Sequence, residues 1–158
     1  MNEVKVYVDG SCLENPGVGG WSAVFCYPYE CKTLKGNEAE TTNNRMELTA
    51  LIETLKKIIK DGEMEEKYTV YSDSAYVVNA IKQNWLENWK FNGWKTKNDE
   101  DVKNKDLWQS LDNLIYALSD KRQLWSLVKI KGHSGNSFNE MADSIAKEQA
   151  KLLKNKKG

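Results

Sequence analysis

The chain has 158 residues, of which 40% are hydrophobic and 29% charged, and its 23 basic residues equal its 23 acidic ones. This length suits one domain, and this composition is typical of a soluble globular protein rather than a disordered or membrane-spanning one. No stretch resembles a signal peptide or reaches transmembrane length, so we expect a cytoplasmic monomer without a membrane partner, in which any phosphate-binding surface is a local patch.

Three strands are predicted in the N-terminal part of the chain. Alternating apolar residues from Val4 to Val8 predict a strand that ends at or near Asp9. Residues 20–29 and 32–38 have the composition of two further strands, joined by a hairpin-like connection. We therefore expect an antiparallel meander at the start of the chain.

The apolar period changes after the third strand. From Asn43 an apolar stripe of helical spacing predicts a helix that Gly62 can close. Residues 67–72 predict a short strand that stops at Asp73, and residues 76–81 predict a short helix after it. Asp73 is thus expected at the carboxyl end of a strand.

The segment 85–104 lacks a regular pattern and mixes tryptophans with lysines, so we expect a protruding element there. The remaining expected elements are a helix, a strand, a closing helix and a frayed charged tail, at residues 107–118, 124–130, 141–153 and 154–158. The sequence thus predicts an α/β fold over one domain, 1–153, with a five-stranded mixed sheet flanked by helices.

Four acidic residues lie where predicted strands and helices meet turns: Asp9, Glu47, Asp73 and Asp143. Ligands in α/β sheets collect beyond the carboxyl ends of parallel strands, so neighbouring first and fourth strands would bring Asp9 and Asp73 together. Carboxylates are preferred ligands of Mg²⁺, and a pair of such ions can activate water against a phosphate ester. These features predict a metal-dependent nuclease.

Each acid also has a purely structural interpretation. Asp9 can belong to a turn, Asp73 can cap the next helix, and Asp143 can favour a helix N-terminus. Asn44 and Glu47 have the spacing of a capping box. Four separate structural explanations are needed, whereas one metal site explains all four residues.

The chain resembles a known family through a set of ordered motifs that covers roughly residues 3–150. The motifs are YVDGSC, TTNNRMEL, SDSAYV, NW..NW...GWKT, VKN.DLW, KGHSG and N..AD. In this order they resemble the type 1 ribonucleases H, and the likeness is greatest to the stand-alone bacterial enzymes with a basic handle protrusion.

The resemblance implies an endonuclease that hydrolyses the RNA strand of RNA–DNA hybrids and leaves 5′-phosphate and 3′-hydroxyl ends. It implies two Mg²⁺ ions, about 4 Å apart, with Mn²⁺ as a possible substitute. Asp9 would be shared between the ions, Glu47 and Asp73 would complete one site, and Asp143 the other. His133, in a glycine-flanked loop, would assist proton transfer or product departure.

Hybrid binding is also implied by the resemblance. The expected substrate contacts are Cys12, Asn15, Thr42, Asn43, Asn44, Trp85, Trp89, Lys90, Trp94 and Lys95. The group around Cys12, Asn15, Asn43 and Glu47 would recognise 2′-hydroxyls, and Thr42, Asn44 and Trp85 would hold the DNA strand. Without the resemblance, the tryptophans fit a core as well as a binding surface.

The chain departs from the family pattern at some positions, and three alternative functions remain open. Ala75 stands where many relatives carry a glutamine, and the handle contains acidic residues, so we expect weaker and less salt-sensitive hybrid binding than in strongly basic relatives. The rival functions are a hybrid-binding module without catalysis, a DNA-cutting enzyme of the same fold and a reverse-transcriptase fragment.

The three cysteines lack disulfide or zinc spacing, and we expect them to be reduced and mostly packed.

Overall fold

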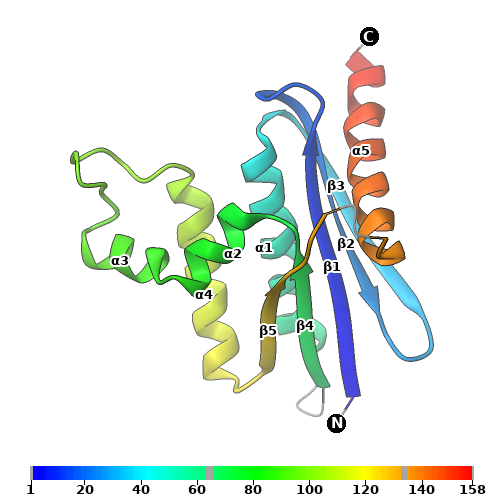
Figure 1. Ribbon diagram of the computed structural model, residues 1–158, viewed down its shortest axis with the longest axis horizontal. Coiled ribbons are helices and arrows are strands. Elements are labelled where there is room, and N and C mark those ends of the chain that lie inside the picture. The colour runs from blue at the N-terminus through cyan, green and yellow to red at the C-terminus, as the bar shows by residue number, and fades with distance from the viewer. Residues whose placement is uncertain (1, 63–65, 133–134, 158) are drawn as a thin grey trace.

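The computed structural model describes residues 2–62, 66–132 and 135–157 (Figure 1). Its elements, in chain order, are β1 (Asn2–Cys12), β2 (Gly17–Cys26), β3 (Cys31–Thr41), α1 (Asn43–Asp61), β4 (Glu66–Ser72), α2 (Ala75–Lys82), α3 (Trp85–Phe91), α4 (Lys105–Asp120), β5 (Leu124–Lys129) and α5 (Ser137–Lys157). Every helix among these residues is too short or too polar to cross a membrane.

The five strands form one mixed sheet in the order β3-β2-β1-β4-β5. β1, β2 and β3 pair in antiparallel fashion, as expected for a meander, whereas β1–β4 and β4–β5 are parallel. The predicted fold class is therefore confirmed. β1 lies in the middle, so the carboxyl ends of β1 and β4 are neighbours, as the proposed convergence of Asp9 and Asp73 requires.

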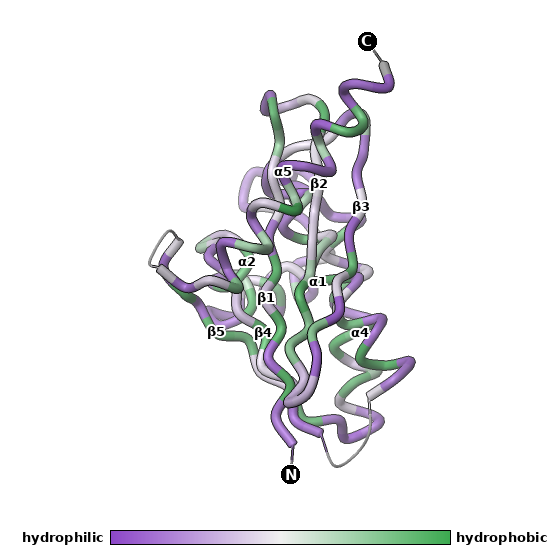
Figure 2. Tube along the Cα trace, turned by 90° about the vertical axis from the view of Figure 1, so that its right-hand side faces the viewer, coloured by the Kyte–Doolittle hydropathy of each residue, from purple (hydrophilic) through white to green (hydrophobic). Residues whose placement is uncertain are grey.

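The two faces of the sheet are covered by different helices (Figure 1). Val6 and Val8 of β1 belong to the large core that α1 and α4 complete, while Tyr7 points the other way and packs with Ala142 of α5. This alternation is the period of two that a strand imposes. Figure 2 shows β3 as largely hydrophilic, in keeping with an edge strand whose residues are mostly exposed.

β1 runs beyond the predicted end at Asp9. Its parallel pairing with β4 stops at Tyr7 and Tyr71, but its antiparallel pairing with β2 continues as far as Cys12 and Gly19. Asp9 therefore lies in a part of β1 that is paired with β2 on one side but is no longer paired with β4 on the other. Its carboxylate is rigidly placed and still borders open space.

The closing helix is longer than predicted at both ends. The Asn136 side chain accepts hydrogen bonds from the backbone N–H groups of Phe138 and Asn139, both at 3.0 Å, and so starts the helix near Ser137. α5 then continues through Lys157, so residues 154–157 are helical rather than a frayed tail. The hairpin also differs, because its connection is the short segment 27–30 and β3 extends to Thr41.

The segment between α2 and α4 extends away from the sheet and contains α3 (Figure 1). Residues 85–104 carry four lysines and four acidic residues, namely Lys90, Lys95, Lys97 and Lys103 against Glu87, Asp99, Glu100 and Asp101. Lys95 lies 2.8 Å from Asp101, and Lys90 lies 3.2 Å from Asp112 of α4. The segment is thus balanced in charge and not basic.

Candidate metal centre

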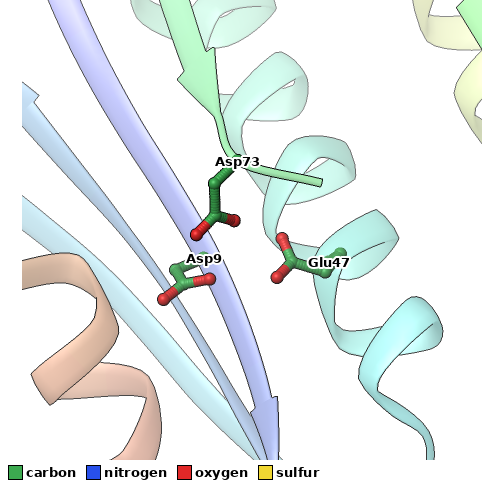
Figure 3. A group of neighbouring side chains, drawn as sticks. All are labelled: Asp9, Glu47 and Asp73. Atoms are coloured by element: carbon green, nitrogen blue, oxygen red, sulfur yellow. The ribbon is translucent and has the colours of Figure 1, made fainter. Parts of the chain in front are cut away.

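Three carboxylates converge beside the carboxyl end of β4 (Figure 3). Asp9 comes from β1, Glu47 from the first turns of α1, and Asp73 directly follows β4. Each offers an oxygen, and these oxygens all lie within 4.8 Å of one another. The structure thus brings together three of the four acids in one cluster, as the strand order predicted.

Gly10 allows α1 to approach β1 closely enough for this cluster to form. A Cβ atom built on Gly10 would lie 2.4 Å from the backbone nitrogen of Glu47 and 2.4 Å from the carbonyl carbon of Met46. No side chain fits in that space, so glycine is required for the close backbone approach. The glycine after Asp9 therefore allows Glu47 to reach the cluster.

Neither Glu47 nor Asp73 is used as a helix cap. Thr42 precedes α1, and its hydroxyl accepts a hydrogen bond from the Arg45 N–H at 3.2 Å, so the capping-box interpretation of Asn44 and Glu47 is wrong. Ser74 caps α2 in the same way, with 3.2 Å to the Val77 N–H. These hydroxyls satisfy the helix ends and leave both carboxylates directed into the cluster.

Asp143 lies at the edge of the cluster. It lines the same surface hollow as Asp9, Glu47 and Asp73, and its Oδ2 is 3.0 Å from Nζ of Lys147, one turn further along α5. Sequence analysis missed Lys147, although its spacing of four residues from Asp143 is a standard signal of a helical ion pair. The fourth predicted acid thus borders the site from the opposite face of the sheet.

Asp9 and Glu47 hold protons at a higher pH than ordinary carboxyls. The pKa of Asp9 is raised from 3.8 to about 7, mainly by burial; a hydrogen bond with Glu47 acts in the opposite direction, and the negative charges of Asp73 and Asp143 add to the rise. Burial, followed by the charge of Asp9, also raises the pKa of Glu47 well above its usual value. Without cations, folding therefore favours the protonated form of both Asp9 and Glu47.

The residues present fit a divalent cation. Oε2 of Glu47 is buried and has no hydrogen-bond partner among the described residues. Leaving such an atom unsatisfied costs about 1–3 kcal/mol, and more for a charged group, whereas a hard cation would satisfy it. The donor set consists of carboxylate oxygens, which suits Mg²⁺ or Mn²⁺ better than a soft transition metal.

Some of the expected substrate contacts border the carboxylates. Cys12, Asn43 and Asn44 line the hollow that contains the cluster, and Asn43, Asn44, Asn15 and Thr42 line an adjoining one. The Asn15 side-chain oxygen accepts a hydrogen bond from the Asn43 backbone N–H at 3.2 Å, which ties the two hollows together. The predicted residues from the two turns thus form one continuous surface.

His133 lies outside the described residues. Its described neighbour Gly132 packs against Asp73, since a Cβ atom on Gly132 would be 2.9 Å from Oδ2 of Asp73. Gly132 itself therefore lies beside the cluster.

The tryptophans of segment 85–104 have different surroundings. Trp85 and Trp89 line a hollow with Lys95, and Trp85 is 38% exposed. Trp89 also packs against the buried Trp108, with ring centroids 5.3 Å apart. Trp94 is partly buried against the core and does not line this hollow.

The start of α1 is held by an ion pair that was not predicted from the sequence. Both terminal nitrogens of Arg45 donate to Asp106 at the start of α4, at 3.0 and 2.8 Å, and one also donates to Asn104 at 3.3 Å. Tyr76 accepts hydrogen bonds from Asn104 and from the Trp108 indole. Because the partners are about 60 positions apart, local sequence patterns carry no signal for this contact.

The sequence model of the RNase H family matches residues 1–151. The ribonuclease H of Syntrophomonas wolfei is 48% identical over 153 residues, which is 97% of this chain and 99% of that protein. LC9-RNase H1, described as a type 1 RNase H with the type 2 active-site motif, is 30% identical with a TM-score of 0.78, over 95% of this chain and 72% of its own. LC11-RNase H1, solved in complex with an RNA/DNA hybrid, shares the fold at 20% identity, with a TM-score of 0.70 over 95% of this chain and 98% of its own.

Proposed function

The chain belongs to the RNase H family and is an enzyme of the ribonuclease H class, and from this premise we propose that it hydrolyses the RNA strand of RNA–DNA hybrids with two divalent cations. The products are 5′-phosphate and 3′-hydroxyl ends. The observation that carries the proposal is the convergence of Asp9, Glu47 and Asp73 within 4.8 Å, with a buried, unpartnered oxygen on Glu47.

The proposed ligand roles follow from the position of each acid. Asp9 interacts with all three other carboxylates, since it hydrogen-bonds with Glu47 and the charges of both Asp73 and Asp143 act on it. It is therefore the residue suited to be shared between two cations, with Glu47 and Asp73 on one side and Asp143 on the other. Lys147 balances the charge of Asp143 and holds it at the edge of the hollow.

Bound divalent cations supply charge stabilisation at the phosphate and acidify water for attack. The protein supplies rigid placement of the ligands. Asp9 is fixed by the strand pairing of β1, Glu47 by the contact of α1 with Gly10, and Asp73 by the end of β4. We propose that His133, which follows Gly132 in the sequence, assists proton transfer or product departure.

We assign recognition of the RNA strand to the residues around the carboxylates. Cys12 and Asn43 line the same hollow as Glu47, so a ribose placed there would present its 2′-hydroxyl to their polar groups. Asn15 holds the backbone of Asn43 in position. Because these groups contact sugar and phosphate rather than base edges, cleavage should depend little on base sequence.

The DNA strand is assigned to the adjoining surface. Thr42 and Asn44 line the second hollow, next to Lys103, and Trp85 and Lys95 line the third. LC11-RNase H1, which shares the fold, was solved in complex with an RNA/DNA hybrid. Lys90 and Trp94 contribute less directly in this proposal, because Lys90 is paired with Asp112 and Trp94 packs against the core.

The balanced charge of segment 85–104 supports a further part of the proposal. Pairing of Lys90 with Asp112 and of Lys95 with Asp101 leaves fewer cations to displace counterions from phosphates. We therefore propose that hybrid binding is less salt-dependent than in relatives with a strongly basic handle. The protein is proposed to act as a cytoplasmic monomer.

A cleavage assay with the RNA strand labelled tests the function directly. The protein is expected to cut a hybrid when Mg²⁺ or Mn²⁺ is present, to stop in excess chelator, and to leave duplex DNA of the same sequence intact. An RNA product with 5′-phosphate and 3′-hydroxyl ends supports the proposed chemistry. Cutting of duplex DNA at a similar rate, or an intact hybrid with either metal, would exclude the proposal in favour of a DNA nuclease or a binding module.

Replacement of Trp85 by Ala is expected to weaken hybrid binding by roughly tenfold, because base or sugar stacking on an aromatic ring contributes about 1–3 kcal/mol. Fluorescence anisotropy in the absence of divalent cations measures the dissociation constant without cleavage. Phe91→Ala is the matched control, since Phe91 lies on the same helix, is 91% exposed and does not line the hollow. Equal losses in the two variants would contradict a specific role for Trp85.

A further inference from the structure

Two cysteines face each other at the end of the β2–β3 hairpin. Cys26 and Cys31 are direct cross-strand partners, and their sulfur atoms are 3.3 Å apart. The backbone N–H of Tyr27 donates to Glu30 at 2.8 Å, so the hydrogen-bonded pair is the next one along. Cys26 and Cys31 thus occupy a non-hydrogen-bonded position, where opposite side chains approach most closely.

The two thiols have different surroundings. Cys26 is half-buried and packs beside Tyr7 and Val24, under α5. Cys31 is exposed on the edge strand. Burial raises the pKa of the Cys26 thiol to about 12, so the sulfur that an oxidant reaches first is Cys31.

The third cysteine is too distant to compete. Cys12 and Lys5 are both on β1, and Lys5 is the residue that pairs with Cys26. The two positions are seven residues apart along the strand, which corresponds to roughly 23 Å. The Cys12 thiol instead donates to the Glu14 carbonyl oxygen at 2.7 Å.

We propose that Cys26 and Cys31 are a redox-active dithiol that closes to a cross-strand disulfide when a low-molecular-weight disulfide oxidises it. The sulfur of Cys31, as thiolate, attacks the oxidant and expels one small thiolate. The sulfur of Cys26 then gives up its proton, attacks that of Cys31 and expels the second small thiolate. Two protein thiols are oxidised and one small disulfide is reduced to two thiols, with the sulfur atoms closing from 3.3 Å to about 2.05 Å.

The disulfide joins an edge strand to its neighbour at the end far from the metal centre. Asp9 pairs with Ser22, four residues before Cys26 on β2, and Cys31 begins β3. Closing the pair therefore fixes the start of the edge strand without moving the carboxylates. We expect slower amide hydrogen exchange in the hairpin and an unchanged rate of hybrid cleavage.

The test is incubation of the full chain in glutathione buffers of increasing oxidised fraction, followed by alkylation and peptide mass spectrometry. Free thiols are expected to fall from three to one per chain, with a mass loss of two hydrogen atoms and the linkage assigned to Cys26 and Cys31. A Cys12→Ser variant should close in the same way, and a Cys31→Ser variant should form no internal disulfide.

Three results would overturn the proposal. They are alkylation of both Cys26 and Cys31 in every buffer, a glutathione adduct on Cys31 that never resolves, and a disulfide between two chains instead of within one. Mutation to serine is conservative in size, and hydrogen exchange of the reduced variants checks that the hairpin is intact. Because the readout is thiol chemistry, it does not depend on whether the proposed nuclease activity is correct.

Discussion

Replacement of Asp9 by Asn is expected to lower the rate of hybrid cleavage by about a thousandfold or more, since losing a shared metal ligand removes several kcal/mol of transition-state stabilisation. Asp9 is the carboxylate that Glu47 contacts and that Asp73 and Asp143 influence, so its change affects both proposed cation positions. The amide has nearly the same shape but no charge. Single-turnover cleavage at saturating protein measures the effect on the chemical step.

Asp120→Asn is the matched control for this variant. It makes the same chemical change at an exposed position at the end of α4, away from the hollow that holds the carboxylates, and its cleavage rate should equal that of the unaltered protein. Thermal unfolding checks that the Asp9 variant is folded. A folded Asp9→Asn protein that cuts hybrids within tenfold of the normal rate would show that Asp9 is not the shared ligand.

The mixed five-stranded sheet, and the convergence of Asp9 with Asp73 if the first and fourth strands are neighbours, could be predicted from sequence for a physical reason. Periods of two and 3.6 residues are local properties, and they identify the elements without knowledge of distant contacts. The rule that ligands gather where parallel strands end then places the two aspartates together. Glu47 could be placed at the same site because its helix starts directly after the meander.

Features that depend on long-range contacts could not be predicted. Asp9 was expected at a strand end, yet β1 continues because β2 extends further than β4. Asn44 has capping-box spacing, but Thr42 caps the helix, and only the structure distinguishes adjacent polar residues. The ion pair of Arg45 with Asp106 and the contact of Cys26 with Cys31 likewise depend on the register of distant segments.

The metal-free protein is expected to lose stability as the pH rises from about 4 to above 7. The pKa of Asp9 is raised from 3.8 to about 7, so the folded protein binds this proton more tightly than the unfolded chain does. The resulting stabilisation is present in full below about pH 4 and is lost as the pH rises through about 7. The raised pKa of Glu47 acts in the same direction.

Chemical unfolding at pH 5 and pH 8 measures this effect, and the free energy of unfolding in chelator should be lower at pH 8 by on the order of 2 kcal/mol. Mg²⁺ should restore more stability at pH 8 than at pH 5, because protons compete with the cation for the same oxygens. Asp9→Asn should reduce both the pH dependence and the gain from Mg²⁺, whereas Asp120→Asn should change neither. If the unaltered protein were more stable at pH 8 than at pH 5 in chelator, folding would not raise the pKa of Asp9 and Glu47, and the prediction would be wrong.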